Sequence, residues 1–270
     1  MNIFFQFFRN LSRYRYLVLQ MIRREISQRY QGSVLGFAWS FLNPLLMLMV
    51  YTFVFSVIFN ARWSGSEVQE SRADFAITLF AGLIVFNIFA EIVNRSPSLI
   101  LSNPNFVKKV IFPLELLPLV SMGAVLFHGA VSLLVLLIAQ ALLKGSVPLT
   151  VVYFPLILLP LLAIGIGLSW FLSALTVYIR DIAHITGIIT SILMFISAVF
   201  FPISALPPRY AFMVELNPVA LVVSESRNAL VFGLPPNWGA LAGMFVVGLW
   251  IAAAGYWWFQ KARKGFADVL

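Results

Sequence analysis

Cysteine is absent from this 270-residue sequence, and charged residues make up only 10% of it. The first absence excludes disulfides and thiolate chemistry. The second sets the chain apart from soluble domains, in which roughly a quarter of the residues are charged. Since 61% of the residues are hydrophobic, we expect an integral membrane protein.

Motifs for catalysis are also lacking. The sequence contains no phosphate-binding GxxxxGK[ST] loop and no HExxH motif. No Ser, His and Asp arrangement and no intramembrane pair of catalytic carboxylates is recognisable either. No predicted cytoplasmic segment is long enough for a nucleotide-binding domain, so the chain is not expected to hydrolyse ATP by itself.

Six apolar stretches have about the 20 residues that a helix needs to cross the hydrocarbon core of a bilayer. They cover residues 34–59, 75–93, 114–143, 151–177, 182–201 and 239–259. The strands of a membrane barrel would instead be about ten residues long, with alternating hydrophobicity. The predicted fold class is therefore an all-α polytopic membrane protein with six transmembrane helices.

Lysine and arginine are distributed unevenly among the breaks between these stretches. The N-terminal segment and every second break after it together hold thirteen of these residues, and the breaks between them hold five. By the positive-inside rule, both termini are then cytoplasmic. The net charge of +8 is read as a topology signal and an attraction to anionic lipid, with no role for nucleic acid.

Residues 1–33 are predicted to form an amphipathic cytoplasmic helix that lies in the membrane interface. Its apolar side would hold Phe4, Phe8, Leu11, Val18 and Met21, and its polar side Gln6, Arg9, Arg13, Gln20 and Arg24. Such a helix serves either as a topology anchor alone or also as a contact for a cytoplasmic partner.

The cytoplasmic break at residues 94–113 carries Lys108 and Lys109 between Pro104 and Pro113. Proline interrupts helices, so any helix here is limited to a couple of turns. A short basic helix at the cytoplasmic face could dock onto another protein, and an ordinary loop with topology charges is the alternative.

Two ionisable side chains inside the predicted spans, those of Glu91 and His128, call for partners. Glu91 precedes Arg95 by one helical turn, a spacing that favours an ion pair over a proton relay. His128 has no second metal ligand at helical spacing, so we expect it to make one interhelical hydrogen bond and to bind no metal.

Polar stripes mark two candidate walls of a substrate path. In the first span the stripe comprises Trp39, Ser40, Asn43, Met47 and Tyr51, and in the fifth it comprises Thr190, Met194 and Ser197. Aromatic rings can stack on the apolar faces of sugars. Packing against protein is the alternative, and it is our interpretation of a further stripe in the fourth span, Gly165, Ser169, Ser173 and Thr176.

The outer segment 202–238 contains six prolines and yet is apolar over residues 219–232. That piece is too short to span the bilayer and too apolar for a solvated loop. We expect a pair of re-entrant or interfacial helices at the outer face. Glu215, Glu225 and Arg227 would then lie near the outer mouth, and residues 261–270 would form a short cytoplasmic tail.

Six segments, distributed along essentially the whole chain, are informative when taken together and in order. They are RREISQRYQGSVLGFAWSFLNPLLMLMVYTFVFSVIF, NPNFVKKVIFPLELLPLV, YIRDI, FFPISALPPRY, ELNPVALVVSESRNALVFG and GFADVL. In this combination the chain resembles the membrane (permease) subunit of ABC transporters that export polysaccharides, the family of the O-antigen, capsule and teichoic-acid exporters.

The resemblance implies a homodimer of six-span subunits, residues 34–260 in each, that enclose a path for a lipid-linked polysaccharide across the bacterial inner membrane. Two separate ATPase subunits would bind ATP and magnesium. Their coupling residues would be Arg23, Arg24, Asn103, Pro104, Asn105, Phe106, Lys108 and Lys109. The outer gate would comprise Pro202, Pro207, Glu215, Pro218, Glu225 and Arg227.

Other functions stay open at this point. A related permease could carry a teichoic-acid-type polymer, a drug or a lipid. A secondary transporter would need ionisable residues paired near the middle of the membrane, where His128 is the strongest candidate. A passive channel would need rings of charge or carbonyl filters, and none is evident.

Overall fold

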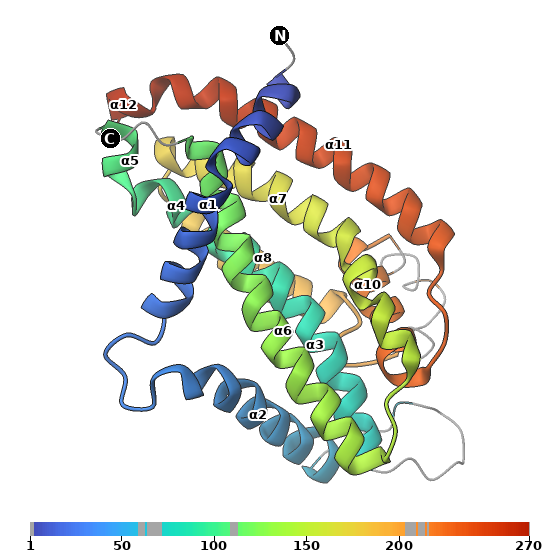
Figure 1. Ribbon diagram of the computed structural model, residues 1–270. Helices are drawn as coiled ribbons and strands as arrows, with labels where there is room; N and C mark the ends of the chain where they lie inside the picture. The colour runs from blue at the N-terminus through green and yellow to red at the C-terminus, as the bar shows by residue number, and fades with distance from the viewer. Residues whose placement is uncertain are drawn as a thin grey trace.

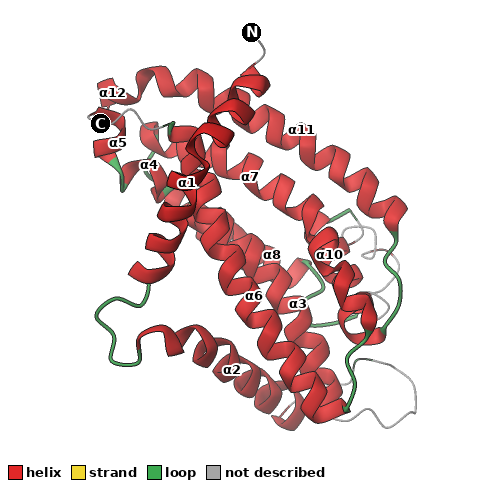
Figure 2. Ribbon diagram, viewed as in Figure 1, coloured by secondary structure: helices red, strands yellow, loops and turns green. Residues whose placement is uncertain are grey.

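The computed structural model describes residues 3–58, 63, 72–108, 113–202, 209, 214 and 216–269, and all regular structure among them is helical (Figure 2). The longer helices are α1 (Ile3–Gln28), α2 (Trp39–Tyr51), α3 (Arg72–Arg95), α6 (Leu117–Lys144), α7 (Phe154–Tyr178), α8 (Ile182–Ile196), α10 (Pro218–Arg227) and α11 (Trp238–Ala262). Short helices are α4 (Ser98–Leu101), α5 (Pro104–Lys108) and α12 (Phe266–Val269). Wider π-helical turns, η2 (Thr52–Ile58) and η6 (Asn228–Phe232), extend α2 and α10. The predicted all-α class is confirmed for the described residues.

Five helical segments in the described part of the chain are long and apolar enough to cross a bilayer. They are Gly36–Val54, Ala73–Arg95, Leu114–Lys144, Leu149–Tyr178 and Trp238–Gly265. The remaining predicted stretch, 182–201, forms α8, which has 15 residues. At 1.5 Å per residue such a helix is about 22 Å long, less than the roughly 30 Å of the hydrocarbon core. The chain is an integral membrane protein, and its sixth span stays a prediction.

Helix α3 occupies the centre of the molecule. Every residue from Phe75 to Phe86 is buried, and α2, α6, α7, α8 and α10 all pack against the helix. Its sequence explains this position, because a helix that is apolar on all sides is stable only when other helices surround it.

Helices α7 and α11 run side by side (Figure 1) and make the most extensive helix pair of the fold. Small residues permit this close approach. A Cβ atom on Gly167 of α7 would lie 2.6 Å from the carbonyl oxygen of Ile251, and one on Gly255 of α11 would collide with the backbone of Gly167.

The predicted small-residue stripe of the fourth span is buried along α7, as a packing role requires. Its members face α3: Gly165 lies against Ile92, and the hydroxyl of Ser169 accepts a hydrogen bond of 2.8 Å from Ser96. Gly165 and Ser169 therefore pack against α3, whereas Gly167, which contacts α11, lies on another side of α7.

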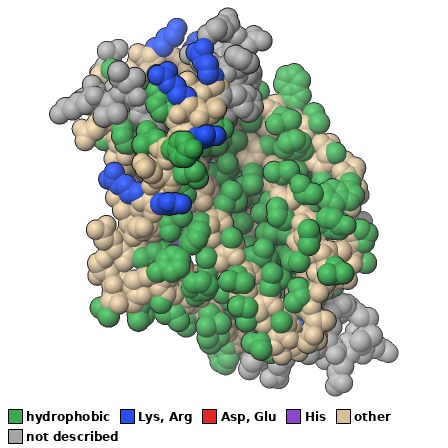
Figure 3. All heavy atoms as spheres, in the orientation of Figure 1, with side chains coloured by type: hydrophobic (Ala, Val, Ile, Leu, Met, Phe, Trp, Pro, Cys, Tyr) green, Lys and Arg blue, Asp and Glu red, His purple; other side chains and the backbone are tan. Residues whose placement is uncertain are grey.

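One end of the molecule gathers α4, α5, α12 and the first turns of α1 (Figure 1). Lysine and arginine side chains concentrate at this end in the space-filling view, whereas the rest of the visible face is largely apolar (Figure 3). Buried Glu115 ties the end together, since its carboxylate accepts from Asn10 of α1 at 3.0 Å and pairs with Arg263, after α11, at 2.8 Å.

We expect the substitution Gly255→Ala to destabilise the protein by about 1–3 kcal/mol, the range typical of overpacking a tight contact. Its added methyl group would push α11 away from the backbone of α7. Thermal unfolding of the purified chain in detergent measures the loss. Gly243→Ala on the same helix is the matched control, because no atom lies within 4 Å of the place that its added methyl group would take. Equal melting temperatures for the two variants would contradict the prediction.

Candidate functional site

A cavity of about 500 Å³ lies between α2, α3 and α6, and the segment that follows α1 closes one side of it. Its walls combine apolar side chains with an unusual number of polar ones for a site between apolar helices. The polar residues are Arg29, Tyr30, Ser40, Asn43, Asn87, Glu91, Asn94, His128 and Ser132. Amides, hydroxyls and charges in this density suit a ligand that is itself rich in polar groups.

Helix α2 supplies three of the predicted path residues to this cavity, namely Ser40, Asn43 and Met47. They recur at helical spacing and so share one face of α2. Pro44 lies beside them and cannot donate the helical hydrogen bond that the carbonyl of Ser40 would accept. The cavity wall thus includes a site of irregular backbone bonding.

Two other residues of the same predicted stripe, Trp39 and Tyr51, are not among the described residues that line the cavity. Both are half-buried. Their aromatic rings lie on α2 outside the polar wall, so stacking on a sugar stays a prediction for them.

The predicted stripe on α8 does not line the cavity within the described residues. Thr190 is buried and donates a hydrogen bond of 3.0 Å to Asn94, which does line it. Met194 packs against the core, and the hydroxyl of Ser197 accepts from Asn217 at 2.9 Å. This stripe packs against neighbouring elements, and its part in a substrate path is still a prediction.

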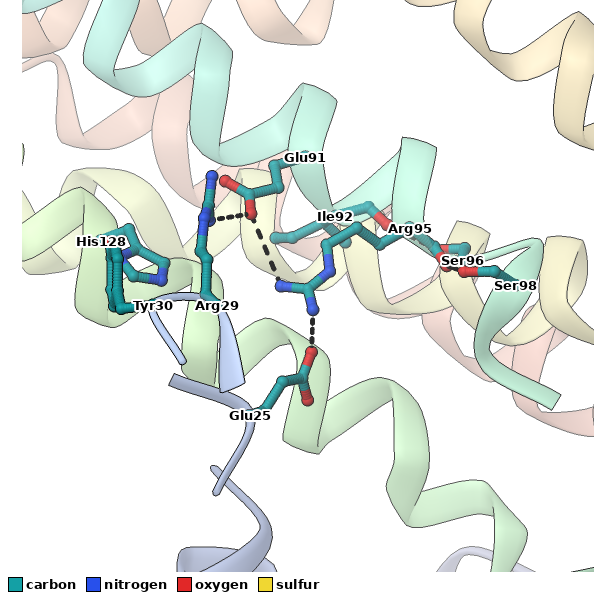
Figure 4. A network of polar contacts seen from close by, with 9 residues as sticks. All are labelled: Glu25, Arg29, Tyr30, Glu91, Ile92, Arg95, Ser96, Ser98 and His128. Atoms are coloured by element: carbon teal, nitrogen blue, oxygen red, sulfur yellow. Dashed lines mark hydrogen bonds and ion pairs between the residues drawn. The ribbon is translucent and has the colours of Figure 1, made fainter. Parts of the chain in front are cut away.

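Four charged side chains form a chain along one edge of the cavity (Figure 4). Glu91 of α3 accepts from Arg29 at 2.6 Å and lies 3.5 Å from Arg95, one turn further on. Arg95 in turn pairs with Glu25 of α1. The predicted Glu91–Arg95 pair is confirmed, and it is extended by Glu25 of α1 at one end and by Arg29, which follows α1, at the other.

The four charged side chains come from two sequence pairs with the same spacing: Glu25 precedes Arg29 by four residues, and Glu91 precedes Arg95 by four residues. The repeated spacing was a signal for the missed partners, although it did not reveal which segments would meet. Burial raises the pKa of Glu25 above its ordinary value, and the positive charge of Arg95 offsets part of this effect.

His128 makes a side-chain hydrogen bond to another element, as predicted, although its partner Tyr30 lies in the turn after α1 and not on a helix. Its Nδ1 atom lies 3.1 Å from the hydroxyl of Tyr30, and the two rings meet edge to face. Burial raises the pKa of Tyr30, so its hydroxyl keeps its proton near neutral pH. Tyr30, next to Arg29, was not among the predicted site residues.

A second cavity of about 380 Å³ lies on the other side of the charged chain, between α1, α4, α5 and α6. Of the predicted coupling residues, Arg24, Asn103 and Phe106 line it. Its walls also include Glu25 and Arg95. The charged chain therefore separates the two cavities: Arg29 and Glu91 line the larger one, and Arg95 and Glu25 line the smaller one.

The other predicted coupling residues lie on the surface or beyond the description. Arg23, Pro104 and Asn105 are exposed. Lys108 is the last residue of α5, and Lys109 lies outside the described residues. A short helix thus starts at Pro104, and its docking role stays a prediction.

At the opposite end, Arg227 of α10 is only 4% exposed. Its guanidinium donates to the carbonyl oxygens of Thr78, Ala198 and Val199 at 3.0, 2.7 and 2.5 Å. It also stacks 4.1 Å from the centre of the Trp63 ring, a cation–π contact.

The remaining predicted gate residues have other surroundings or lie outside the described residues. Glu225 is buried and accepts from the backbone N–H of Asn237 at 2.9 Å. Pro218 begins α10, and Pro202 is half-buried after α8. Pro207 and Glu215 lie outside the described residues.

Comparison with known proteins gives a consistent assignment. Residues 16–231 match the model of the family described as ABC-2 type transporter. An O-antigen export system permease protein, RfbA of Klebsiella pneumoniae, is 22% identical over 95% of its length and 94% of this chain. RfbA of Myxococcus xanthus, with the same description, is 34% identical over 41% of this chain, and that match spans only 39% of the relative.

We expect a double-mutant cycle of Glu25→Gln and Arg95→Gln to give a coupling of about 1 kcal/mol, within the range for residues that share an ion-pair network. Both single variants lose the same pair, so the double variant should lose less stability than the sum. Thermal unfolding in detergent supplies the four values. A cycle of Glu25→Gln with Lys144→Gln, which lies at the far end of α6 and pairs with Asp74, should be additive. Additivity in both cycles would contradict a direct Glu25–Arg95 interaction.

Proposed function

The chain belongs to the ABC-2 type transporter family, and from this premise we propose that it is the membrane subunit of an ATP-driven exporter. Its cargo is a lipid-linked polysaccharide of the O-antigen type, which it moves from the cytoplasmic to the outer side of the bacterial inner membrane. Two copies of the chain form the channel, and two copies of a separate ATPase subunit drive it.

The observation that carries this proposal is the similarity over nearly the full length to a protein described as an O-antigen export system permease. The sequence lacks a phosphate-binding loop of its own, which fits a subunit whose ATPase is another polypeptide. The polar cavity between α2, α3 and α6 adds support, since its amides and hydroxyls can bind sugar hydroxyls.

The topology of the proposed subunit has six spans, with α8 and the turn after it as the fifth. In the proposed topology both termini are cytoplasmic. The position of the first turns of α1 and of helix α12 at the same, basic end of the molecule supports this orientation. Helix α1 lies in the membrane interface with Leu11, Val18 and Met21 against the core. The segment of α10 and η6 enters the membrane from the outer face, and the residues around Arg227 gate the exit.

The proposal is tested by reconstituting the chain with the ATPase encoded beside it and measuring polymer translocation into proteoliposomes. ATP-dependent transport of a lipid-linked polysaccharide is the expected result. Transport of a teichoic-acid-type polymer, a drug or a lipid in its place would reassign the cargo. Transport under a proton gradient without the ATPase would identify a secondary transporter and overturn the proposal.

Reversing both charges at Lys108 and Lys109 should weaken binding of the ATPase subunit by about tenfold, equivalent to about 1.4 kcal/mol. The reason is that α5, which ends at Lys108, lies at the basic end, where an ATPase would dock. Co-purification and ATPase stimulation measure the loss, and membrane insertion should be unchanged. Arg180→Glu, an exposed cation between α7 and α8, is the control for total charge. Unaltered stimulation in the double variant would count against docking through this loop.

A further inference from the structure

The charged chain is also the wall between the two cavities. Arg29 and Glu91 line the larger cavity, whereas Glu25 and Arg95 line the smaller one. The wall consists of side chains that reach across from α1 and α3, and ion pairs hold it closed (Figure 4). Rotation of these side chains would join the cavities without any movement of the helix backbones.

Glu91 is the residue on which this wall depends. One of its oxygens, Oε1, contacts both Arg29 and Arg95. A single carboxylate group thus bridges two guanidinium groups, and it occupies a position where an anion with more oxygens would fit as well. Phosphate groups accept paired hydrogen bonds from guanidinium groups in the same way as carboxylates do.

The two arginines of the charged chain are partly exposed to solvent, which favours exchange of their carboxylate partner for another anion. The side chain of Arg29 is 45% exposed, and that of Arg95 is 32% exposed. These ion pairs are therefore weaker than fully buried ones, and water or another anion can reach them. An incoming anion would find both cations already placed, while Glu91 could turn toward the open cavity.

Neutral amide side chains beside the four charged residues could also contact a polar ligand. Asn87 and Asn94 lie one turn on either side of Glu91 along α3, and Asn43 faces them from α2. Amide groups both donate and accept, as the recognition of hydroxyl groups requires. An anion-binding centre with amides beside it is suited to a phosphorylated sugar.

We propose that Arg29 and Arg95 bind the phosphate of the lipid-linked substrate's head group in exchange for Glu91. The exchange opens the wall, so that the head group passes from the smaller, cytoplasmic cavity into the larger one. This inference rests on the proposed function for its cargo. The ligand is a phosphate or diphosphate attached to an apolar chain, and a free phosphate is the alternative source of the same chemistry.

The test measures equilibrium binding of radiolabelled farnesyl diphosphate, a short lipid diphosphate, to the purified full-length chain in detergent. We expect Arg29→Gln to weaken binding by about tenfold, the loss typical of one charge-assisted hydrogen bond. Arg29→Lys should restore part of it. Glu91→Gln should tighten binding several-fold, because it removes the competing carboxylate and leaves both cations in place.

Opposite shifts from Arg29→Gln and Glu91→Gln distinguish exchange from a merely structural role, in which loss of either partner would disturb the wall and weaken binding. Asp74→Asn and Lys144→Gln break an ion pair at the other end of α3 and α6, and they should leave binding unchanged. Melting temperatures identify any variant that is misfolded, and Arg29→Lys then supplies the comparison.

Weaker binding in Glu91→Gln, or no change in any variant, would overturn the proposal. Inorganic diphosphate that competes as well as farnesyl diphosphate would overturn the lipid head group as the source. The two proposals fail separately. ATP-driven export with binding insensitive to Arg29 would refute only the exchange, whereas opposite shifts in a chain that exports no polysaccharide would refute only the proposed function.

Discussion

The burial of α3 on all sides is the constraint on which the rest of the structure depends. This burial extends from Phe75 to Phe86, and the charged residues of α3 lie beyond it, where they are partly exposed and pair with neighbouring elements. At one end, Asp74 pairs with Lys144 of α6 at 2.8 Å. At the other, Glu91 and Arg95 pair with Arg29 and Glu25. The charges at the ends of α3 therefore fix where α1 and α6 lie.

The guanidinium groups of Arg95 and Arg227 show two different solutions to this constraint. Arg95 is paired with two carboxylates, those of Glu25 and Glu91, and all three side chains are partly exposed. Arg227 is bound by three backbone carbonyls, which cannot rotate away, and a Cβ on Gly82 of α3 would overlap its guanidinium. Ala198, one of the acceptors, has a φ of 51°, a left-handed conformation that is strained for alanine. Backbone carbonyls thus hold Arg227 at one end of the molecule, whereas side-chain carboxylates hold Arg95 at the other.

The sequence was sufficient for those features that depend on neighbours along the chain. Hydrophobic stretches predicted the long helices, the spacing of Glu91 and Arg95 predicted their pair, and Pro104 and Pro113 predicted that any helix between them is short. The sequence did not predict contacts between segments that are distant along the chain. Glu25 and Arg95 are separated by 70 positions, and nothing in the local pattern of either segment selects the other.

The two polar stripes show, within the site, that a local pattern does not reveal which partner a helix face contacts. Ser40, Asn43 and Met47 on α2 line a cavity, whereas Thr190 and Ser197 on α8 hydrogen-bond to Asn94 and Asn217. Polarity on one helical face means only that the face avoids lipid. Whether it meets a cavity or a protein partner depends on the neighbouring helices, which the stripe itself does not specify.

The size of the larger cavity suits the binding of a head group but not the passage of a polymer. At about 500 Å³ it matches a site for a drug-sized ligand, and so it can enclose a head group but not a long polymer. A polymer needs a longer passage, and one subunit offers α2 as an incomplete wall, polar toward the cavity and apolar on its exposed residues such as Leu45 and Met49. In the proposed dimer, the head group is therefore selected within one subunit, at the charged chain, and the polymer that follows it passes between the two.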